Sequence, residues 1–313
     1  MSGRDGVLDC VIVGGGPAGL TAATYLGRFL RSVLIVDDGG SRMKTIPLSR
    51  NTPGFPDGIA GEDLHARMTA QALKYGAEFS GGLATHIERR DGLFEVTTPG
   101  GVRTARTVLL ATGVKLDAPE IDRLEDGLAR GAIRYCPICD GFEAADRKVA
   151  VLGGRRNSLN EAVFLRTYTA DVSFVPARGG PLISSDEAAE ARRCGVRITS
   201  RADSLRLTPE GVSVTYDSGD EETFEIVYPC LGSAPQTQLI EELGVELGES
   251  GGVVTDRHQR SSVAGLYVAG DVLDGLDQIA SACGQAAIAA TAIHNDLPPH
   301  ARSRSRRIEI SEA

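Results

Sequence analysis

The sequence lacks a positive net charge, a long apolar run and an apolar leader, and each absence excludes a class of protein. The net charge of −9 over 313 residues argues against a nucleic acid or an anionic membrane as partner, because both select basic surfaces. No stretch is long and apolar enough to span a bilayer, and residues 1–6 are polar, unlike a signal peptide. We therefore expect a cytoplasmic protein with no nucleic-acid or membrane partner. A cluster of four arginines near the C-terminus is an exception to the acidic composition, and we expect it to be a solvated chain end. These residues are Arg302, Arg304, Arg306 and Arg307.

The sequence also lacks the cysteine pattern of a small secreted domain, since its six cysteines are scattered at positions 10, 136, 139, 194, 230 and 283. Cys136 and Cys139 form a C-x-x-C pair, a spacing that also serves zinc sites. No histidine or second cysteine pair is placed to complete a tetrahedral site, so we expect no metal. Two thiols at this spacing can close a disulfide, or hold a mixed disulfide and resolve it, and the adjacent Asp140 can give or take a proton. These three residues are the candidate catalytic group.

A complete dinucleotide-binding fingerprint lies near the N-terminus. The apolar run at residues 8–13 predicts a buried parallel strand, which enters a G-x-G-x-x-G turn at residues 14–19. A helix at about residues 17–30 and a strand at 32–36 follow, and that strand ends at Asp37. In such a turn the first glycine makes the bend, the second lets the backbone approach a pyrophosphate, and the third lets helix and strand pack closely, while the acid accepts from a ribose hydroxyl. This segment is therefore predicted to bind a dinucleotide.

The same plan of strand, glycine turn, helix, strand and β meander restarts after residue 147, and a strand at 265–271 returns to the first part. The chain is long enough for two domains, and 38 glycines suit the tight turns of an α/β protein. We expect two Rossmann-like, three-layer ββα dinucleotide-binding domains, the second inserted in the first. The first would comprise residues 1–115 and 246–313. The inserted domain, which carries the C-x-x-C pair, would comprise residues 116–245.

The second glycine turn departs from the fingerprint. Arg155 occupies the middle glycine position, where a side chain obstructs the approach of a phosphate. The next strand ends at Pro176, Ala177 and Arg178 without an acid for a ribose. One interpretation is that Arg155 swings into solvent and a nucleotide still binds; the other is that nicotinamide binding is weakened or abolished. Arg155, Arg156 and Arg178 could also hold another anion, although solvated side chains explain them equally well.

These motifs, in this order, resemble those of low-molecular-weight thioredoxin reductases and related flavin-dependent disulfide oxidoreductases over nearly the whole chain. The matching segments are residues 14–23, 51–56, 110–113, 136–142 and 268–272. The resemblance implies FAD in the first domain and usually a homodimer. It also implies that Cys139 faces the flavin, that Cys136 exchanges with substrate and that Asp140 is the acid/base. The residues that it implies around FAD are Gly14, Gly16, Pro17, Ala18 and Gly19 at the pyrophosphate, Asp37 at the adenosine ribose, Asn51, Gln278 and Ile279 near the isoalloxazine, Asp271 at the ribitol, and Thr112, Gly113 and Gly270 from the other matched segments.

The chain departs from the NADPH-using members of this family. They carry glycine where this chain has Arg155, and a His-Arg-Arg-x-x-x-Arg pattern of which residues 176–182 keep one arginine. Their arginine before the flavin-side glutamine is Asp277 here. In these losses the chain is similar to members that do not use NADPH, such as dithiol oxidases and reductases with another electron donor. Several dithiol oxidases have histidine after the second cysteine, whereas this chain has Asp140.

Three hypotheses follow. The first is an FAD-dependent thiol–disulfide oxidoreductase that cycles a Cys136–Cys139 disulfide against the flavin, with doubtful use of NADPH. The second is an NADPH-dependent thioredoxin-disulfide reductase, and the third is a non-enzymatic flavin redox sensor. The expected partner is a thioredoxin-like protein or a small-molecule dithiol or disulfide.

Overall fold

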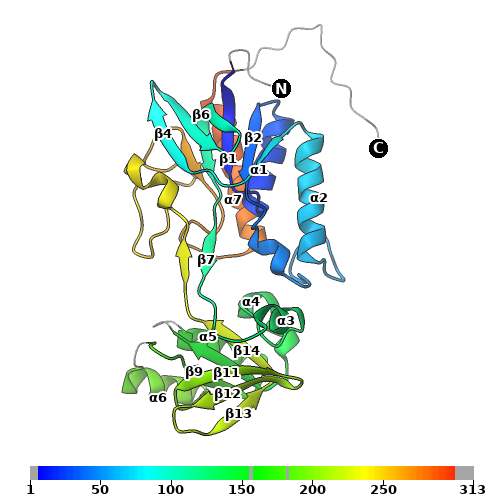
Figure 1. The fold of residues 1–313 in the computed structure, drawn as a ribbon, viewed down its shortest axis with the longest axis vertical. Helices are drawn as coiled ribbons and strands as arrows, with labels where there is room; N and C mark the ends of the chain where they lie inside the picture. The colour runs from blue at the N-terminus through cyan, green and yellow to red at the C-terminus, as the bar shows by residue number, and fades with distance from the viewer. Residues whose placement is uncertain (1–5, 155–157, 181–182, 300–313) are drawn as a thin grey trace.

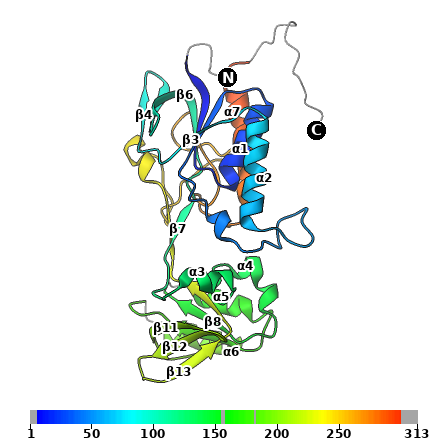
Figure 2. The same cartoon turned by 45° about the vertical axis from the view of Figure 1, so that its right-hand side comes forward.

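The computed structural model describes residues 6–154, 158–180 and 183–299, which form two lobes, one above the other in Figures 1 and 2. Arg155, Arg156, Leu182 and the tail arginines named above lie outside the described residues. Within the described part of the chain, no helix is long and apolar enough to cross a membrane.

The upper lobe is built on a seven-stranded sheet in the order β3-β2-β1-β6-β5-β4, with β16 also paired to β6. Strands β3, β2, β1, β6 and β16 run parallel, and β4 and β5 add an antiparallel edge. Helices α1 and α7 pack together and α2 packs against α1. The bounds are β1 Leu8–Val13, α1 Pro17–Arg28, β2 Val33–Asp37, η1 Arg42–Thr45, α2 Gly61–Lys74, β3 Glu78–Gly81, β4 His86–Arg90, β5 Leu93–Thr98, β6 Gly101–Leu110, η3 Gln238–Leu243, β16 Leu266–Val268 and α7 Ile279–Asp296.

The lower lobe repeats this plan with a four-stranded parallel sheet in the order β10-β9-β8-β14 and a separate three-stranded antiparallel sheet. The two chain crossings between the lobes, β7 (Val114–Leu116) and β15 (Ser233–Pro235), pair antiparallel. The remaining bounds are α3 Leu124–Ala129, α4 Pro137–Asp140, η2 Phe142–Ala144, β8 Val149–Gly153, α5 Ser158–Leu165, β9 Val172–Pro176, α6 Ser185–Arg193, β10 Arg197–Ile198, β11 Ala202–Thr208, β12 Gly211–Tyr216, β13 Glu221–Phe224 and β14 Ile226–Cys230.

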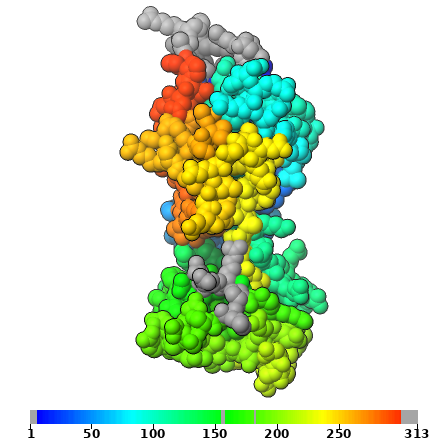
Figure 3. Space-filling view, turned by 90° about the vertical axis from the view of Figure 1, so that its left-hand side faces the viewer, coloured from blue at the N-terminus to red at the C-terminus, as the bar shows by residue number. Residues whose placement is uncertain are grey.

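Strand β1 is buried on both faces, as its unbroken apolar run predicts. Cys10 and Ile12 pack with the inner faces of α1 and α7, whereas Val11 and Val13 belong to a core on the other side of the sheet. Each such aliphatic side chain stabilises the fold by about 1.5–3 kcal/mol on burial. The segment 236–275, yellow to orange in Figure 3, covers this second side, and its Ile240 joins that core.

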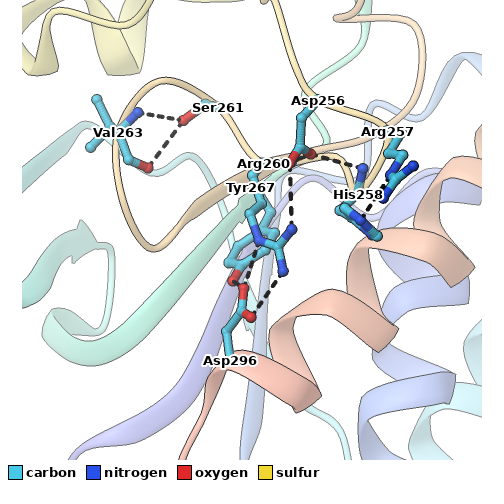
Figure 4. Close-up of polar contacts among 8 residues, drawn as sticks. All are labelled: Asp256, Arg257, His258, Arg260, Ser261, Val263, Tyr267 and Asp296. Atoms are coloured by element: carbon cyan, nitrogen blue, oxygen red, sulfur yellow. Dashed lines mark hydrogen bonds and ion pairs between the residues drawn. The ribbon is translucent and has the colours of Figure 1, made fainter.

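The C-terminal end of α7 is anchored to β16 by a polar network (Figure 4). The Tyr267 hydroxyl donates to Asp296 over 2.6 Å, and the Arg260 guanidinium donates to both carboxylate oxygens of Asp296 over 2.7 and 2.9 Å. Arg260 also pairs with Asp256 at 3.4 Å. The opposite end of α7 begins directly after Gln278.

Candidate active site

The first glycine turn is shaped by the packing of its own chain. Gly14 has φ +108°, and a Cβ there would lie 2.2 Å from the Ala111 carbonyl oxygen. A Cβ at Gly19 would lie 1.9 Å from the Gly14 oxygen, so α1 could not pack so closely on β1. At Gly16 the nearest atom would be the Ser41 Oγ at 3.5 Å. The first and third glycines are therefore needed for packing, whereas Gly16 leaves open space.

That space belongs to a cleft of about 1270 Å³ between the lobes. All the expected cofactor residues line it except Gly19, which packs behind the turn. The Asp37 carboxylate accepts from the Gly15 amide over 2.9 Å, and Arg42 pairs with Asp271 at 2.8 Å. The hydroxyl of Ser41 is buried and has no hydrogen-bond partner among the described residues. An open glycine turn, an unpartnered hydroxyl and a carboxylate at the end of β2 together suit the pyrophosphate and ribose of a dinucleotide such as FAD.

The candidate catalytic cysteines lie on the lower lobe and also line this cleft. Cys136 and Cys139 form a disulfide across the single turn of α4. Pro137 suits the first position of the helix, and the Cys139 amide donates to the Cys136 sulfur over 3.1 Å. A Cβ at Gly141 would lie 2.5 Å from the Pro137 oxygen and 2.7 Å from the Tyr168 ring. Glycine at 141 thus lets the end of the motif pack directly on the lower-lobe core.

The Gln278 side chain joins the two lobes at the disulfide. Its Nε2 lies 3.3 Å from the sulfurs of both Cys136 and Cys139, and its Oε1 accepts from the Asn51 amide over 2.9 Å. Arg50 and Glu143 form a second link between the lobes, with Nε and Oε1 3.7 Å apart. The structure therefore brings the expected flavin-side residues and the expected catalytic cysteines into contact.

Asp140 is held by a residue that the sequence reasoning missed. The Tyr228 hydroxyl donates to Asp140 Oδ1 over 2.8 Å, and Arg134 Nε lies 3.9 Å from Oδ2. Burial raises the pKa of Asp140 above its usual range, and the hydrogen bond from Tyr228 acts in the opposite direction. The sequence did contain a signal for Tyr228. Its hydroxyl lies in the otherwise apolar strand Ile226–Cys230, and a buried hydroxyl requires a polar partner.

The second glycine turn is different. The loop after β9 lies against it: a Cβ at Gly180 would lie 3.2 Å from the Gly153 oxygen and 3.3 Å from the Gly154 Cα. Arg201 secures the loop by donating to the carbonyl oxygens of Ala177 and Gly180 over 2.9 and 3.3 Å. Arg178, one of the arginines considered for another anion, pairs instead with Asp203 at 3.7 Å.

A dinucleotide-binding fold with a C-x-x-C disulfide in its cleft defines a disulfide oxidoreductase. The family described as pyridine nucleotide-disulphide oxidoreductase matches residues 8–286, and the chain belongs to this family. It is 30% identical to a thioredoxin reductase of Listeria monocytogenes over 307 residues, covering 92% of this chain and 93% of the relative. A thioredoxin reductase of Treponema pallidum is 31% identical over 297 residues, covering 91% and 95%.

Solved structures give the same result. The crystal structure of HlmI superposes with a TM-score of 0.85 at 28% identity, covering 93% of both chains. A thioredoxin reductase from Streptococcus pyogenes also has a TM-score of 0.85 at 28% identity, covering 92% and 97%. The expected α/β fold with two dinucleotide-binding domains is confirmed. The chain is a flavin-dependent disulfide oxidoreductase, and its family implies binding of FAD and a nicotinamide dinucleotide.

Proposed function

We propose that the enzyme moves electrons between a dithiol or disulfide substrate and FAD through Cys136 and Cys139, and that NADPH is a poor donor. The observation that carries the proposal is the contrast between the described parts of the glycine turns: Gly16 of the first opens on the cleft, whereas Gly153 and Gly154 of the second lie against the Gly180 backbone, in a loop secured by Arg201. FAD would be held by the first turn, Asp37 and Asp271, and when bound it supplies a two-electron redox centre beside the disulfide.

The cysteines divide the chemistry into two exchanges. One substrate thiolate attacks the Cys136 sulfur, which forms a mixed disulfide and releases Cys139 as a thiolate. The second substrate thiol then displaces Cys136, so the substrate loses two electrons and two protons and the enzyme gains them as two thiols. Gln278 Nε2, 3.3 Å from both sulfurs, would stabilise negative charge on whichever sulfur leaves. Asp140 would take or return the thiol proton. In the reducing direction the same steps run backwards.

Weak use of NADPH is supported by three features of the lower lobe. Pro176, where β9 ends, offers no carboxylate to a ribose. Arg178 already pairs with Asp203, and the Gly180 backbone lies against the turn where a pyrophosphate would approach. A reductase fed by another donor and a dithiol oxidase are both consistent with this arrangement.

Anaerobic titration tests the proposal. The flavin band of the holoenzyme should bleach with dithiothreitol and remain with stoichiometric NADPH over the same period. A Cys139→Ser variant should lose turnover, whereas Cys194→Ser, the matched control at the end of α6, should keep it. Rapid bleaching by NADPH would instead establish the second candidate. Absence of multiple turnover with every dithiol and disulfide would leave the redox sensor.

The second candidate, an NADPH-dependent reductase of a thioredoxin-like protein, is favoured by the names of the two relatives and by the surface beside the disulfide. Ile138 is 53% exposed and Phe142 is 77% exposed. Two large apolar side chains exposed beside the disulfide favour a protein as the binding partner over a small dithiol. Saturable oxidation of the reduced enzyme by oxidised thioredoxin, lost in Phe142→Ser and kept in the control Leu73→Ser on the exposed face of α2, would support it.

The domain limits and the homodimer expected above are also part of the proposal. The limit at 115/116 falls within the crossing β7. The limit at 245/246 lies beyond η3, and because Ile240 packs in the upper-lobe core, the second limit is better placed just after the crossing β15. A dimer face is suggested by Tyr25 on α1 and Ile288 on α7, which are 41% and 44% exposed and line a common hollow. Light scattering should give a molar mass twice that of one chain, and the Ile288→Lys variant should have the mass of a single chain.

A further inference from the structure

Tyr228 is the residue through which the core of the lower lobe reaches the candidate acid/base. It lies on β14 opposite Val151 of the parallel sheet, and its side chain is fully buried. Its hydroxyl lies 2.8 Å from Asp140 Oδ1 and 3.4 Å from the Asp140 carbonyl oxygen. A buried phenol requires a hydrogen-bond acceptor, and here both acceptors belong to one residue of the redox motif.

The other charged groups around Asp140 come from three more elements. Arg134, before α4, donates to the Asp140 carbonyl oxygen over 3.0 Å and places its Nε 3.9 Å from Oδ2. Glu143 on η2 is the neighbouring acid and is paired with Arg50 of the upper lobe. The carboxylate is therefore bonded to a neutral donor at Oδ1 and faces a cation at Oδ2, and its side chain is one third exposed.

We propose that Tyr228 is a positioning residue for the thiol–disulfide chemistry: its hydroxyl occupies Oδ1 and fixes the orientation of the Asp140 carboxylate that exchanges a proton with Cys139. The inference rests on the proposed function, in which Asp140 is the acid/base. In the step, the S–H bond of Cys139 breaks and an O–H bond to the Asp140 carboxylate forms, which leaves a thiolate and a neutral carboxylic acid. Only a proton moves in this step; the electrons move in the disulfide exchange itself.

The direction of the effect follows from the hydrogen bond. Donation by a phenol stabilises the ionised carboxylate, so it counteracts the burial that raises the pKa of Asp140. Replacing Tyr228 by phenylalanine keeps the buried ring and removes the donor. The pKa of Asp140 should then rise further, and the carboxylate should lose its fixed orientation.

The chain offers a matched control in the same lobe. Tyr216 on β12 is also buried, and its hydroxyl donates to Glu222 over 2.8 Å. Tyr216→Phe therefore removes the same kind of hydrogen bond without touching the redox motif. The test compares Tyr228→Phe, Tyr216→Phe, Asp140→Asn and the unaltered full-length holoenzyme. After anaerobic reduction, the rate of iodoacetamide alkylation at Cys139 is measured against pH by mass spectrometry. This readout does not depend on turnover.

The unaltered protein should show an acidic inflection linked to the carboxyl group in addition to that of the thiol, and Asp140→Asn should abolish it. Tyr228→Phe should move this inflection to higher pH, and Tyr216→Phe should leave it in place. If Asp140→Asn changes nothing, Asp140 is not coupled to the thiol and the acid/base assignment of the proposed function fails. If Asp140→Asn abolishes the inflection but Tyr228→Phe behaves like Tyr216→Phe, that assignment stands and the present inference is overturned.

Discussion

The two glycine turns share a fold requirement and differ in their access to ligands. A Cβ at Gly14 would lie 2.2 Å from Ala111, and one at Gly153 would lie 2.1 Å from the Phe174 ring, so each lobe keeps a glycine for packing. The surroundings of the described residues differ: Gly16 opens on the cleft, whereas Gly153 and Gly154 lie against the Gly180 backbone, in a loop secured by Arg201. A Rossmann-like lobe can therefore keep its architecture while its binding surface changes, because different residues meet the two requirements.

The largest effect should come from alanine at the packing glycine of the first turn. Gly14→Ala places a Cβ against backbone at a positive φ, which costs about 1–3 kcal/mol of strain and moves the turn away from the phosphates. We expect protein purified with almost no flavin and a lower melting temperature. Gly154→Ala is the control in the second turn, where the nearest atom is the Leu231 Cα at 3.1 Å, and it should keep its flavin. Equal flavin-to-protein ratios in the two variants would contradict the comparison.

A smaller effect is expected at the end of β2. Asp37→Ala removes the acceptor of the Gly15 amide and the carboxylate proposed to face the ribose. Hydrogen bonds to charged groups contribute about 1.5–3 kcal/mol each, so the dissociation constant for FAD should rise roughly 10- to 100-fold. Asp57→Ala is the control, since Asp57 is exposed and does not line the cleft. Isothermal titration calorimetry of each apoprotein variant with FAD measures the two dissociation constants. Equal constants would show that Asp37 does not contribute to FAD binding.

What the sequence could predict depends on how far apart the interacting residues are. The first strand, expected at residues 8–13, is observed there, and the helix expected at about residues 17–30 is observed at Pro17–Arg28, because local periodicity and turn chemistry determine both. The motif also identified the cysteine pair that is bonded in the structure. The bond from Tyr228 to Asp140 spans 88 positions, and the contact from Gln278 to Cys136 spans 142. Such pairings arise from tertiary packing: the strand around Tyr228 indicates that its hydroxyl needs a partner, but no local pattern identifies which residue that partner is.

An effect of intermediate size is expected from the loop that follows β9 and lies against Gly153 and Gly154. Arg201→Ala removes both hydrogen bonds to the carbonyl oxygens of Ala177 and Gly180, so this loop should move away from Gly154 more readily. Since Arg155 remains, the rate of anaerobic flavin reduction by NADPH should rise only modestly, by roughly 3- to 10-fold, as expected for about 1 kcal/mol of lost hydrogen bonding. Arg206→Ala is the control, because Arg206 is an exposed arginine of the same lobe that pairs with Glu221 away from the loop. An unchanged or slower rate in Arg201→Ala would mean that this loop does not limit NADPH.

The smallest effect concerns the partly exposed network of Tyr216, Glu222 and Arg197 in the lower lobe. Burial raises the pKa of Glu222. Hydrogen bonds from Arg197, Lys148 and Tyr216 outweigh this effect and lower the pKa to about 2, compared with 4.5 for a free glutamate carboxyl. Ionised Glu222 thus stabilises the fold above about pH 4.5, and this contribution is lost as the pH falls toward 2. After screening it should amount to about 1 kcal/mol.

Glu222→Gln should therefore melt below the unaltered protein at pH 6, and the gap should narrow at pH 3. In the upper lobe Arg260 likewise lowers the pKa of Asp296, so Asp296→Asn is the matched variant. Calorimetry that separates the melting of the two lobes should place each loss in its own lobe. If Glu222→Gln also lowered the melting temperature of the upper lobe, the two lobes would unfold as one unit. The two lobes would then differ in ligand access at their glycine turns but not in stability.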